Sequence, residues 1–169
     1  MKAEDLRALQ APIKDRYRAD AEAGVVTMRA SGELGQESLT CKVETGRALV
    51  EAGLHEAAGG NGLTTCSGDM LLEALVACAG VTLGAVATAL EIPITSGRVT
   101  AEGDLDFRGT LGVEKTAPVG FRDIRLKFEV ESDATPEQLA TLLKLTERYC
   151  VVYQSLRQSP PIAVDIVAE

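Results

Sequence analysis

Cysteine offers the most reactive side chain in this sequence, and four cysteines are present: Cys41, Cys66, Cys78 and Cys150. They lie too far apart to form a Cys-x-x-Cys pair, and the single histidine, His55, does not complete a recognisable zinc site with them. The sequence also lacks the glycine-rich phosphate-binding motifs of nucleotide-binding proteins. Core packing and thiol chemistry are the two uses that remain for these cysteines.

The position of each thiol narrows its role. Cys41 lies on the apolar face of an alternating segment and Cys78 lies within a long apolar segment, so by pattern alone both are core residues. Cys66 precedes that apolar segment, and a thiol at the positive end of a helix dipole is favoured as a nucleophile. Cys66 and Cys78 are twelve residues apart, which along a helix is about 18 Å and too far for a disulfide. A redox pair that uses a thiol of this helix must therefore include Cys150 or Cys41.

The apolar segment itself, residues 70–90, carries one formal charge and is long enough to cross a bilayer. It is rich in alanine and glycine, has no basic flank and lies in the middle of an acidic chain, so we expect a helix buried inside protein rather than in a membrane. Gly80 and Gly84, four residues apart, would let another backbone approach closely. A second subunit is the natural cover for such a helix.

Alternation of apolar and polar residues predicts strands before the helix. We expect an antiparallel meander over residues 16–23, 25–30 and 38–44, followed by a glycine-rich loop over residues 55–68.

Further strands are predicted after the helix. Residues 98–107 and 121–131 alternate in the same way and predict a hairpin, and residues 162–168 predict a short terminal strand.

A second helix is predicted to start at the sequence Thr-Pro-Glu-Gln, residues 135–138, which supplies a capping hydroxyl, a proline for the first turn and a glutamine three residues after the cap. If this helix stays regular, its apolar stripe places Cys150 on the side that faces the core. Pro160 and Pro161 end any helical structure that extends from Val151. Because strands and helices are segregated rather than alternating, the fold class is α+β, mostly antiparallel, in a single domain over residues 1–169.

Composition and charge exclude several classes of partner. Seventeen basic and 25 acidic residues give a net charge of −8, the wrong sign for binding nucleic acid or an anionic membrane surface. Residues 1–18 are charged throughout and lack the apolar run of a signal peptide, so we expect a cytoplasmic protein without structural disulfides.

The segment SGDMLLEALVACAGVTL, residues 67–83, is followed by ERYCVVY, residues 147–153. The two motifs resemble those of the family of osmotically inducible protein C and organic hydroperoxide resistance protein. The resemblance covers nearly the whole chain and includes the order of its predicted elements. It implies an OsmC-like fold, in which antiparallel sheets surround a long buried central helix, in an intertwined homodimer with two active sites at the subunit interface.

The same resemblance implies a chemistry and the residues that perform it. Cys78 matches the family's peroxidatic cysteine, whose thiolate attacks an organic hydroperoxide or hydrogen peroxide and becomes a sulfenic acid. Cys150 matches the resolving cysteine, which forms a disulfide with it. A dithiol, in better studied relatives a lipoyl protein, reduces that disulfide, and no metal or cofactor is needed. The activating arginine would come from the N-terminal segment, with Arg18 the first choice and Arg29 the second.

The sequence departs from the family pattern at two places. Ser67 and Gly68 stand where the family's peroxidases carry a Pro-Glu pair, whose glutamate helps to hold the activating arginine, and no proline follows Cys150. These departures define an alternative, a divergent dimer with weak or no catalysis that binds an apolar small molecule in the same interface pocket.

Overall fold

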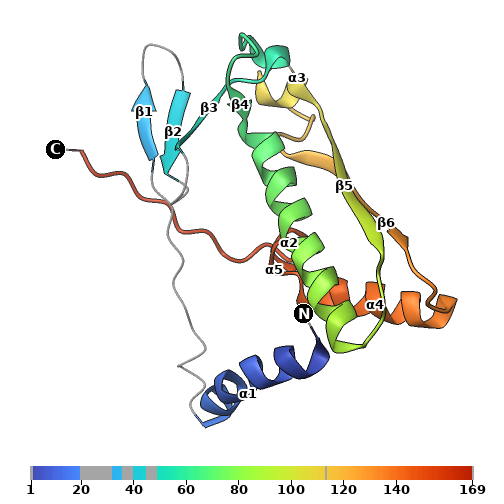
Figure 1. Ribbon diagram of the computed structural model, residues 1–169. Coiled ribbons are helices and arrows are strands. Elements are labelled where there is room, and N and C mark those ends of the chain that lie inside the picture. Colours follow the sequence, from blue (N-terminus) through green and yellow to red (C-terminus); the bar gives the residue numbers. More distant parts are fainter. Residues whose placement is uncertain (1, 20–31, 36–39, 45–48, 113, 169) are drawn as a thin grey trace.

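A long central helix organises the structure. The computed structural model describes residues 2–19, 32–35, 40–44, 49–112 and 114–168. Helix α2 (Ser67–Ala89) contacts both a β-hairpin and two C-terminal helices (Figure 1). Its length and composition would suffice to cross a membrane, a criterion that the core helix of a soluble protein also meets. The expected apolar helix is thus confirmed, packed against protein on part of its surface.

Two sheets accompany α2. In the first, β1 (Gly32–Gly35), β2 (Thr40–Glu44) and β3 (Leu49–Gly53) pair antiparallel in sequence order, and the short strand β4 (Thr65–Cys66) pairs parallel with β3. A short 3-10 helix, η2 (Glu56–Ala58), lies between β3 and β4. The described part of the predicted third strand, residues 40–44, is confirmed.

The second sheet is the predicted hairpin. It consists of β5 (Ser96–Leu105) and β6 (Phe121–Glu131), which pair antiparallel along nearly their whole length. A single helical turn, α3 (Phe107–Thr110), lies in the connection between them. Alternate residues of β6 are half-buried and exposed, as expected for a sheet with one face on the core.

The C-terminal helices α4 (Pro136–Tyr149) and α5 (Val151–Arg157) are consecutive and are separated only by Cys150. The predicted start of α4 is confirmed in detail. Thr135 Oγ1 accepts a hydrogen bond from the Gln138 N–H, and Gln138 Oε1 accepts one from the Thr135 N–H at 2.9 Å. This reciprocal capping box satisfies two amides that a helix otherwise leaves unpaired.

The buried core lies where α2 and α4 meet the hairpin. Leu83, Val86 and Ala87 from α2 and Leu142 from α4 are buried together with Ile92. Half-buried side chains of β6, Phe128 and Val130 among them, close the cluster. Burial of these apolar side chains fixes the position of α4, and therefore of its end at Cys150, relative to α2.

The predicted N-terminal strand over residues 16–23 is wrong in its described part, residues 16–19, because these residues belong to helix α1 (Ala3–Ala19). Residues 20–23 lie outside the described residues. Most residues of α1 are strong helix formers, and Glu4 and Asp5 lie in its first turn, where the helix dipole favours acidic groups. Arg7 of α1 pairs with Glu91 at 2.9 Å. The predicted strand over residues 25–30 lies outside the described residues.

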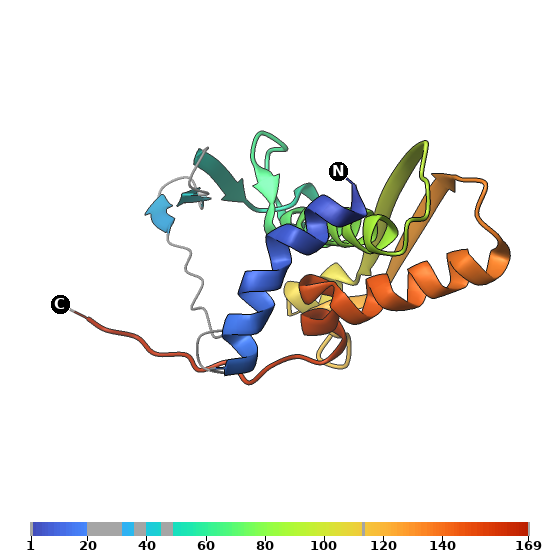
Figure 2. The same cartoon turned by 60° about the horizontal axis from the view of Figure 1, so that its bottom comes forward.

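The predicted terminal strand over residues 162–168 is also wrong within this single chain. After α5 the chain runs away from the helices without regular structure (Figures 1 and 2). Ile162, Val164 and Ile166 are 80%, 89% and 90% exposed. An alternating segment becomes a strand only when a sheet edge pairs with it, and no described strand does so here.

Candidate active site

The two predicted catalytic cysteines come together where α4 ends and α5 begins. Cys78 lies in the middle of α2 and is half-buried, whereas Cys150 lies at the break between the two C-terminal helices and is 1% exposed. A hydrogen bond joins the two thiols. The sequence separates these residues widely, and packing of α4 and α5 on α2 brings them into contact.

The surroundings of Cys78 favour its thiolate. Burial is the largest single influence and opposes ionisation, but hydrogen bonds outweigh it and hold the pKa of Cys78 below its usual value. The donors are the backbone N–H groups of Val152 and Val151, at the start of α5, and the side chains of Cys150 and, with the smallest effect, Thr82. Helix-terminal N–H groups aimed at a sulfur are a known means of activating a cysteine nucleophile.

Cys150 has the opposite character. Its burial raises the pKa of the thiol, and the neighbouring Cys78 raises it further. Both pKa shifts are those expected when the Cys150 thiol donates a hydrogen bond and the Cys78 sulfur accepts it. The pair therefore ionises first at Cys78 and holds one thiolate and one thiol between its two pKa values, the state that a nucleophile with a resolving partner requires.

A groove of about 750 Å³ has lining residues one helical turn from each cysteine, although neither thiol lines it. Its lining includes Leu75, one turn before Cys78 on α2, and Tyr153, one turn after Cys150. Most of its other lining residues are apolar side chains from β6, α4 and α5: Phe121, Ile124, Leu126, Phe128, Leu143 and Leu156. Its charged lining residues are Arg122, Asp123, Glu147 and Arg157. The groove can hold an apolar molecule with a polar end.

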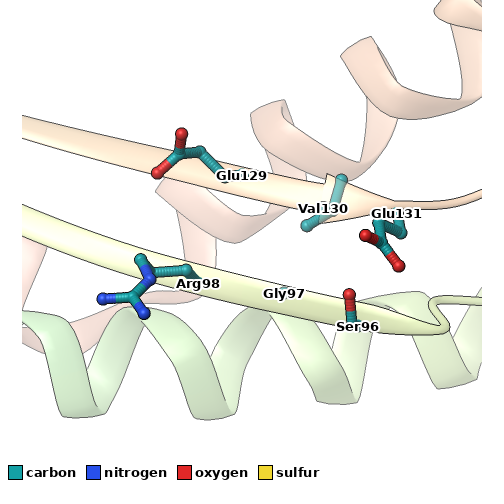
Figure 3. A pocket seen from close by; sticks show the side chains of 6 residues that line it. All are labelled: Ser96, Gly97, Arg98, Glu129, Val130 and Glu131. Carbon is teal, nitrogen blue, oxygen red and sulfur yellow. The ribbon is translucent and has the colours of Figure 1, made fainter.

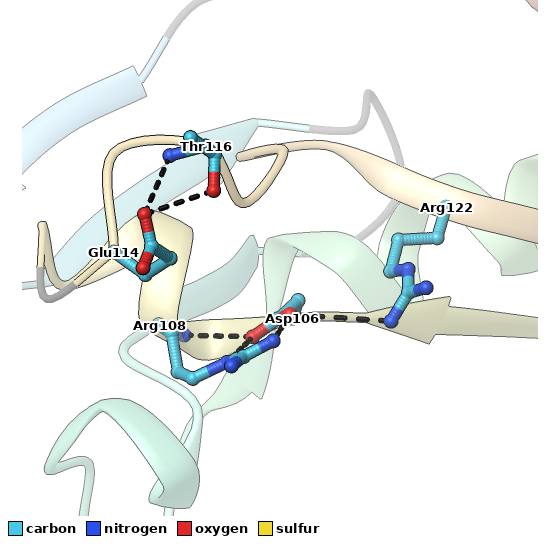
Figure 4. A network of polar contacts seen from close by, with 5 residues as sticks. All are labelled: Asp106, Arg108, Glu114, Thr116 and Arg122. Atoms are coloured by element: carbon cyan, nitrogen blue, oxygen red, sulfur yellow. Dashed lines mark hydrogen bonds and ion pairs between the residues drawn. The ribbon is translucent and has the colours of Figure 1, made fainter.

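One groove arginine belongs to a polar network at the end of β5 (Figure 4). Arg122 lies 3.9 Å from the Asp106 carboxylate, which also accepts a 2.6 Å hydrogen bond from Arg108. The bond from Arg108 is the main reason that the pKa of Asp106 falls to about 2. Asp106 is therefore ionised at neutral pH and helps to hold Arg122 at the groove.

A second hollow, of about 440 Å³, lies at the opposite end of the hairpin (Figure 3). Its lining consists of Ser96, Gly97, Arg98, Glu129, Val130 and Glu131. In the described part of the chain, no group of three or more His, Cys, Asp or Glu side chains could hold a metal ion.

The other residues singled out from the sequence lie elsewhere or outside the description. Cys66 is half-buried at the N-cap of α2, as its position before the helix predicts. Cys41 lies in β2 opposite Leu34 and Ala52. Arg18 lies in α1, its side chain is outside the described part of the structure, and Arg29 lies wholly outside it.

Sequence reasoning missed the backbone donors of the site. A regular helix through Cys150 would have used the N–H groups of Val151 and Val152 within the helix, so their role could not be seen in an uninterrupted apolar stripe. The available signal was Val151-Val152 directly after Cys150, since β-branched residues lower helix propensity.

Comparison with known proteins gives a family for this arrangement. A family model described as OsmC-like protein matches residues 59–165, more than half of the chain and including both thiols. No curated protein matches the chain in sequence.

Solved structures share the fold at low sequence identity. An OsmC-like protein from Mycoplasma pneumoniae is 17% identical, with 79% of this chain and 89% of that chain covered and a TM-score of 0.65. An organic hydroperoxide resistance protein from Elizabethkingia anophelis is 19% identical, over 80% of this chain and 91% of that chain, with a TM-score of 0.63. An organic hydroperoxide resistance protein OsmC from Legionella pneumophila is 17% identical, over 79% of this chain and 91% of that chain, with a TM-score of 0.62.

Proposed function

Because the chain belongs to the OsmC-like protein family, we propose that it is a thiol-dependent peroxidase in which Cys78 reduces hydroperoxides and Cys150 resolves the product. The observation that carries this proposal is the hydrogen-bonded thiol pair, with the pKa lowered at Cys78 and raised at Cys150. A pair in which one thiol ionises readily and the other stays protonated supplies a nucleophile and its resolving partner in one site.

In the proposed reaction the Cys78 thiolate attacks the terminal oxygen of the hydroperoxide and the O–O bond breaks. The sulfur is oxidised to a sulfenic acid, and the peroxide is reduced to an alkoxide, which needs a proton to leave as an alcohol. Cys150 is placed to supply that proton, because burial keeps its thiol protonated beforehand. Losing the proton leaves Cys150 as the thiolate that attacks the sulfenic sulfur, forms the disulfide and releases hydroxide.

The groove suggests which hydroperoxides the site accepts. Its apolar lining, from Leu75, one turn before Cys78, to Leu156 on α5, favours an organic hydroperoxide over hydrogen peroxide because an apolar body gains by leaving water. A dithiol completes the cycle by reducing the Cys78–Cys150 disulfide, and a lipoyl protein of the cytoplasm is the reductant we propose. Arg18 remains our proposed source of a positive charge near Cys78.

We further propose that the protein acts as an intertwined homodimer. A stripe of mostly small residues on α2 remains exposed in the single chain: Ala74, Ala77, Val81, Gly84 and Ala85. Val81, its one larger member, is 75% exposed. The exposed apolar tail over residues 162–168 is a second unpartnered surface. Exposed apolar surfaces of this kind favour association, and Cys78 lies at the border of the α2 stripe, so the dimer interface would adjoin the active site.

The test of the proposed reaction is the Cys150→Ser variant. We expect it to react once with cumene hydroperoxide and then stop, because the Cys78 sulfenic acid has no thiol to condense with. Mass spectrometry should find Cys78 as sulfenic acid, or as sulfinic acid at excess hydroperoxide. The wild-type protein should instead form a Cys78–Cys150 disulfide that dihydrolipoamide reduces. A disulfide between other cysteines, or none, would contradict the proposed roles.

The departure at Ser67-Gly68, together with the apolar groove, favours one second candidate, a noncatalytic dimer that binds an apolar small molecule. The pH dependence of thiol alkylation separates the two functions. For the peroxidase we expect the Cys78 midpoint below that of an ordinary thiol, near 8.5, and the Cys150 midpoint above it, since only the first is stabilised as a thiolate. Reduced wild-type protein, analysed peptide by peptide, gives both values. Two midpoints at or above 8.5 would favour the binding protein.

A further inference from the structure

The side chain of Gln154 closes the break between α4 and α5. Its Nε2 atom donates a 2.7 Å hydrogen bond to the backbone carbonyl oxygen of Glu147. A carbonyl oxygen only accepts hydrogen bonds, so the amide must present its nitrogen here. Gln154 is half-buried, and its own backbone N–H donates to the Cys150 carbonyl, which is the first hydrogen bond of α5.

The Glu147 carbonyl is the acceptor that a continuous helix would have given to the Val151 N–H, four residues later. The last regular bond of α4 is the one from the Cys150 N–H to the Thr146 carbonyl at 2.9 Å. At Cys150 the backbone turns to an extended conformation, with ψ 108°. The Val151 and Val152 N–H groups thereby leave the helical ladder and donate to the Cys78 sulfur.

We propose that Gln154 is a positioning residue for the thiol pair, because its side-chain amide replaces the Val151 N–H on the Glu147 carbonyl and so leaves that N–H free for Cys78. Without this replacement the carbonyl of the half-buried Glu147 would lack a protein donor and would compete for the Val151 N–H. A continuous helix through Cys150 would then satisfy the carbonyl at the expense of the sulfur. The inference rests on the proposed role of Cys78 as the nucleophile.

The test is Gln154→Met, which keeps the length of the side chain and removes the donor. We expect the pH midpoint of Cys78 alkylation to rise and its rate at pH 7 to fall about three- to tenfold, the effect of losing one hydrogen bond to a thiolate. Gln158→Met is the matched control, the same substitution one turn further along at the exposed end of α5. It should leave the Cys78 midpoint unchanged.

Gln154→Lys should restore the donor and the low midpoint. The measurement is repeated at high salt, where the added charge is screened but the hydrogen bond is not. A merely structural role would lower the thermal unfolding midpoint of Gln154→Met without moving the Cys78 midpoint, and that result would overturn the proposal. A raised midpoint in Gln154→Lys at high salt, or an equal shift in Gln158→Met, would also overturn it. The reduced protein is titrated without hydroperoxide, so absence of peroxidase activity would refute the proposed function and leave this result standing.

Discussion

The Cys78→Ser protein should consume organic hydroperoxides no faster than a mixture of hydroperoxide and dithiol alone. Serine is close to cysteine in size, but its hydroxyl does not ionise near neutral pH and forms no sulfenic acid. The N–H groups of Val151 and Val152, which stabilise a thiolate at this position, would then face a neutral oxygen. We expect a loss on the order of 10³-fold or more in the rate with dihydrolipoamide as reductant, as when other enzymes lose their nucleophile.

Cys66→Ser is the matched control for this variant. Cys66 occupies the N-cap of the same helix and makes no capping hydrogen bond with its side chain, while serine is among the preferred N-cap residues. The variant should fold and keep the wild-type rate. Wild-type activity no higher than that of Cys78→Ser would refute the peroxidase, and equal losses in both variants would remove the distinction between the two thiols.

Those parts of the fold that depend on local pattern could be predicted from the sequence. The capping box at Thr135 satisfies its hydrogen bonds with residues three positions apart, and the hairpin of β5 and β6 pairs two neighbouring segments with clear alternation. Helix α2 is apolar over most of its length, so a helix that packs against protein could be predicted there from composition, although one face of it stays exposed in the single chain. The pairing of Cys78 with Cys150 followed from the family resemblance, because no local pattern relates two residues so far apart.

Other features depend on surroundings that the sequence does not display. Residues 162–168 have the alternation of a strand, yet they are exposed because no described edge pairs with them. The four residues 16–19 alternate, but helix propensity over the rest of α1 outweighs so short a pattern. The backbone donors of Val151 and Val152 arise from a helix break at Cys150. Such a break cannot be recognised from the sequence unless the group that replaces a lost helical donor, here the Gln154 side chain, is known.

The second large effect concerns assembly, and Gly84→Leu should reveal it. Gly84 lies on the exposed stripe of α2, and a Cβ atom added there meets no atom within 4 Å in the single chain. If the chain were a monomer, leucine would be harmless or stabilising, because glycine inside a helix costs about 1 kcal/mol. In a dimer whose central helices meet at this stripe, two leucines would enter one close contact, and overpacking costs about 1 to 3 kcal/mol at each.

We therefore expect Gly84→Leu to raise the dimer dissociation constant by about 10²-fold or more, as measured by sedimentation over a range of concentrations. Ala140→Leu adds the same side chain at an exposed position of α4 and should sediment as the wild type does. Hydroperoxide consumption should fall in parallel with the dimer fraction, because Cys78 borders the stripe and its site would lose the cover of the second subunit. A wild-type protein that sediments as a folded monomer at micromolar concentration would refute the dimer. A dissociated Gly84→Leu protein with full activity would instead show that the thiol pair and its groove work within one chain.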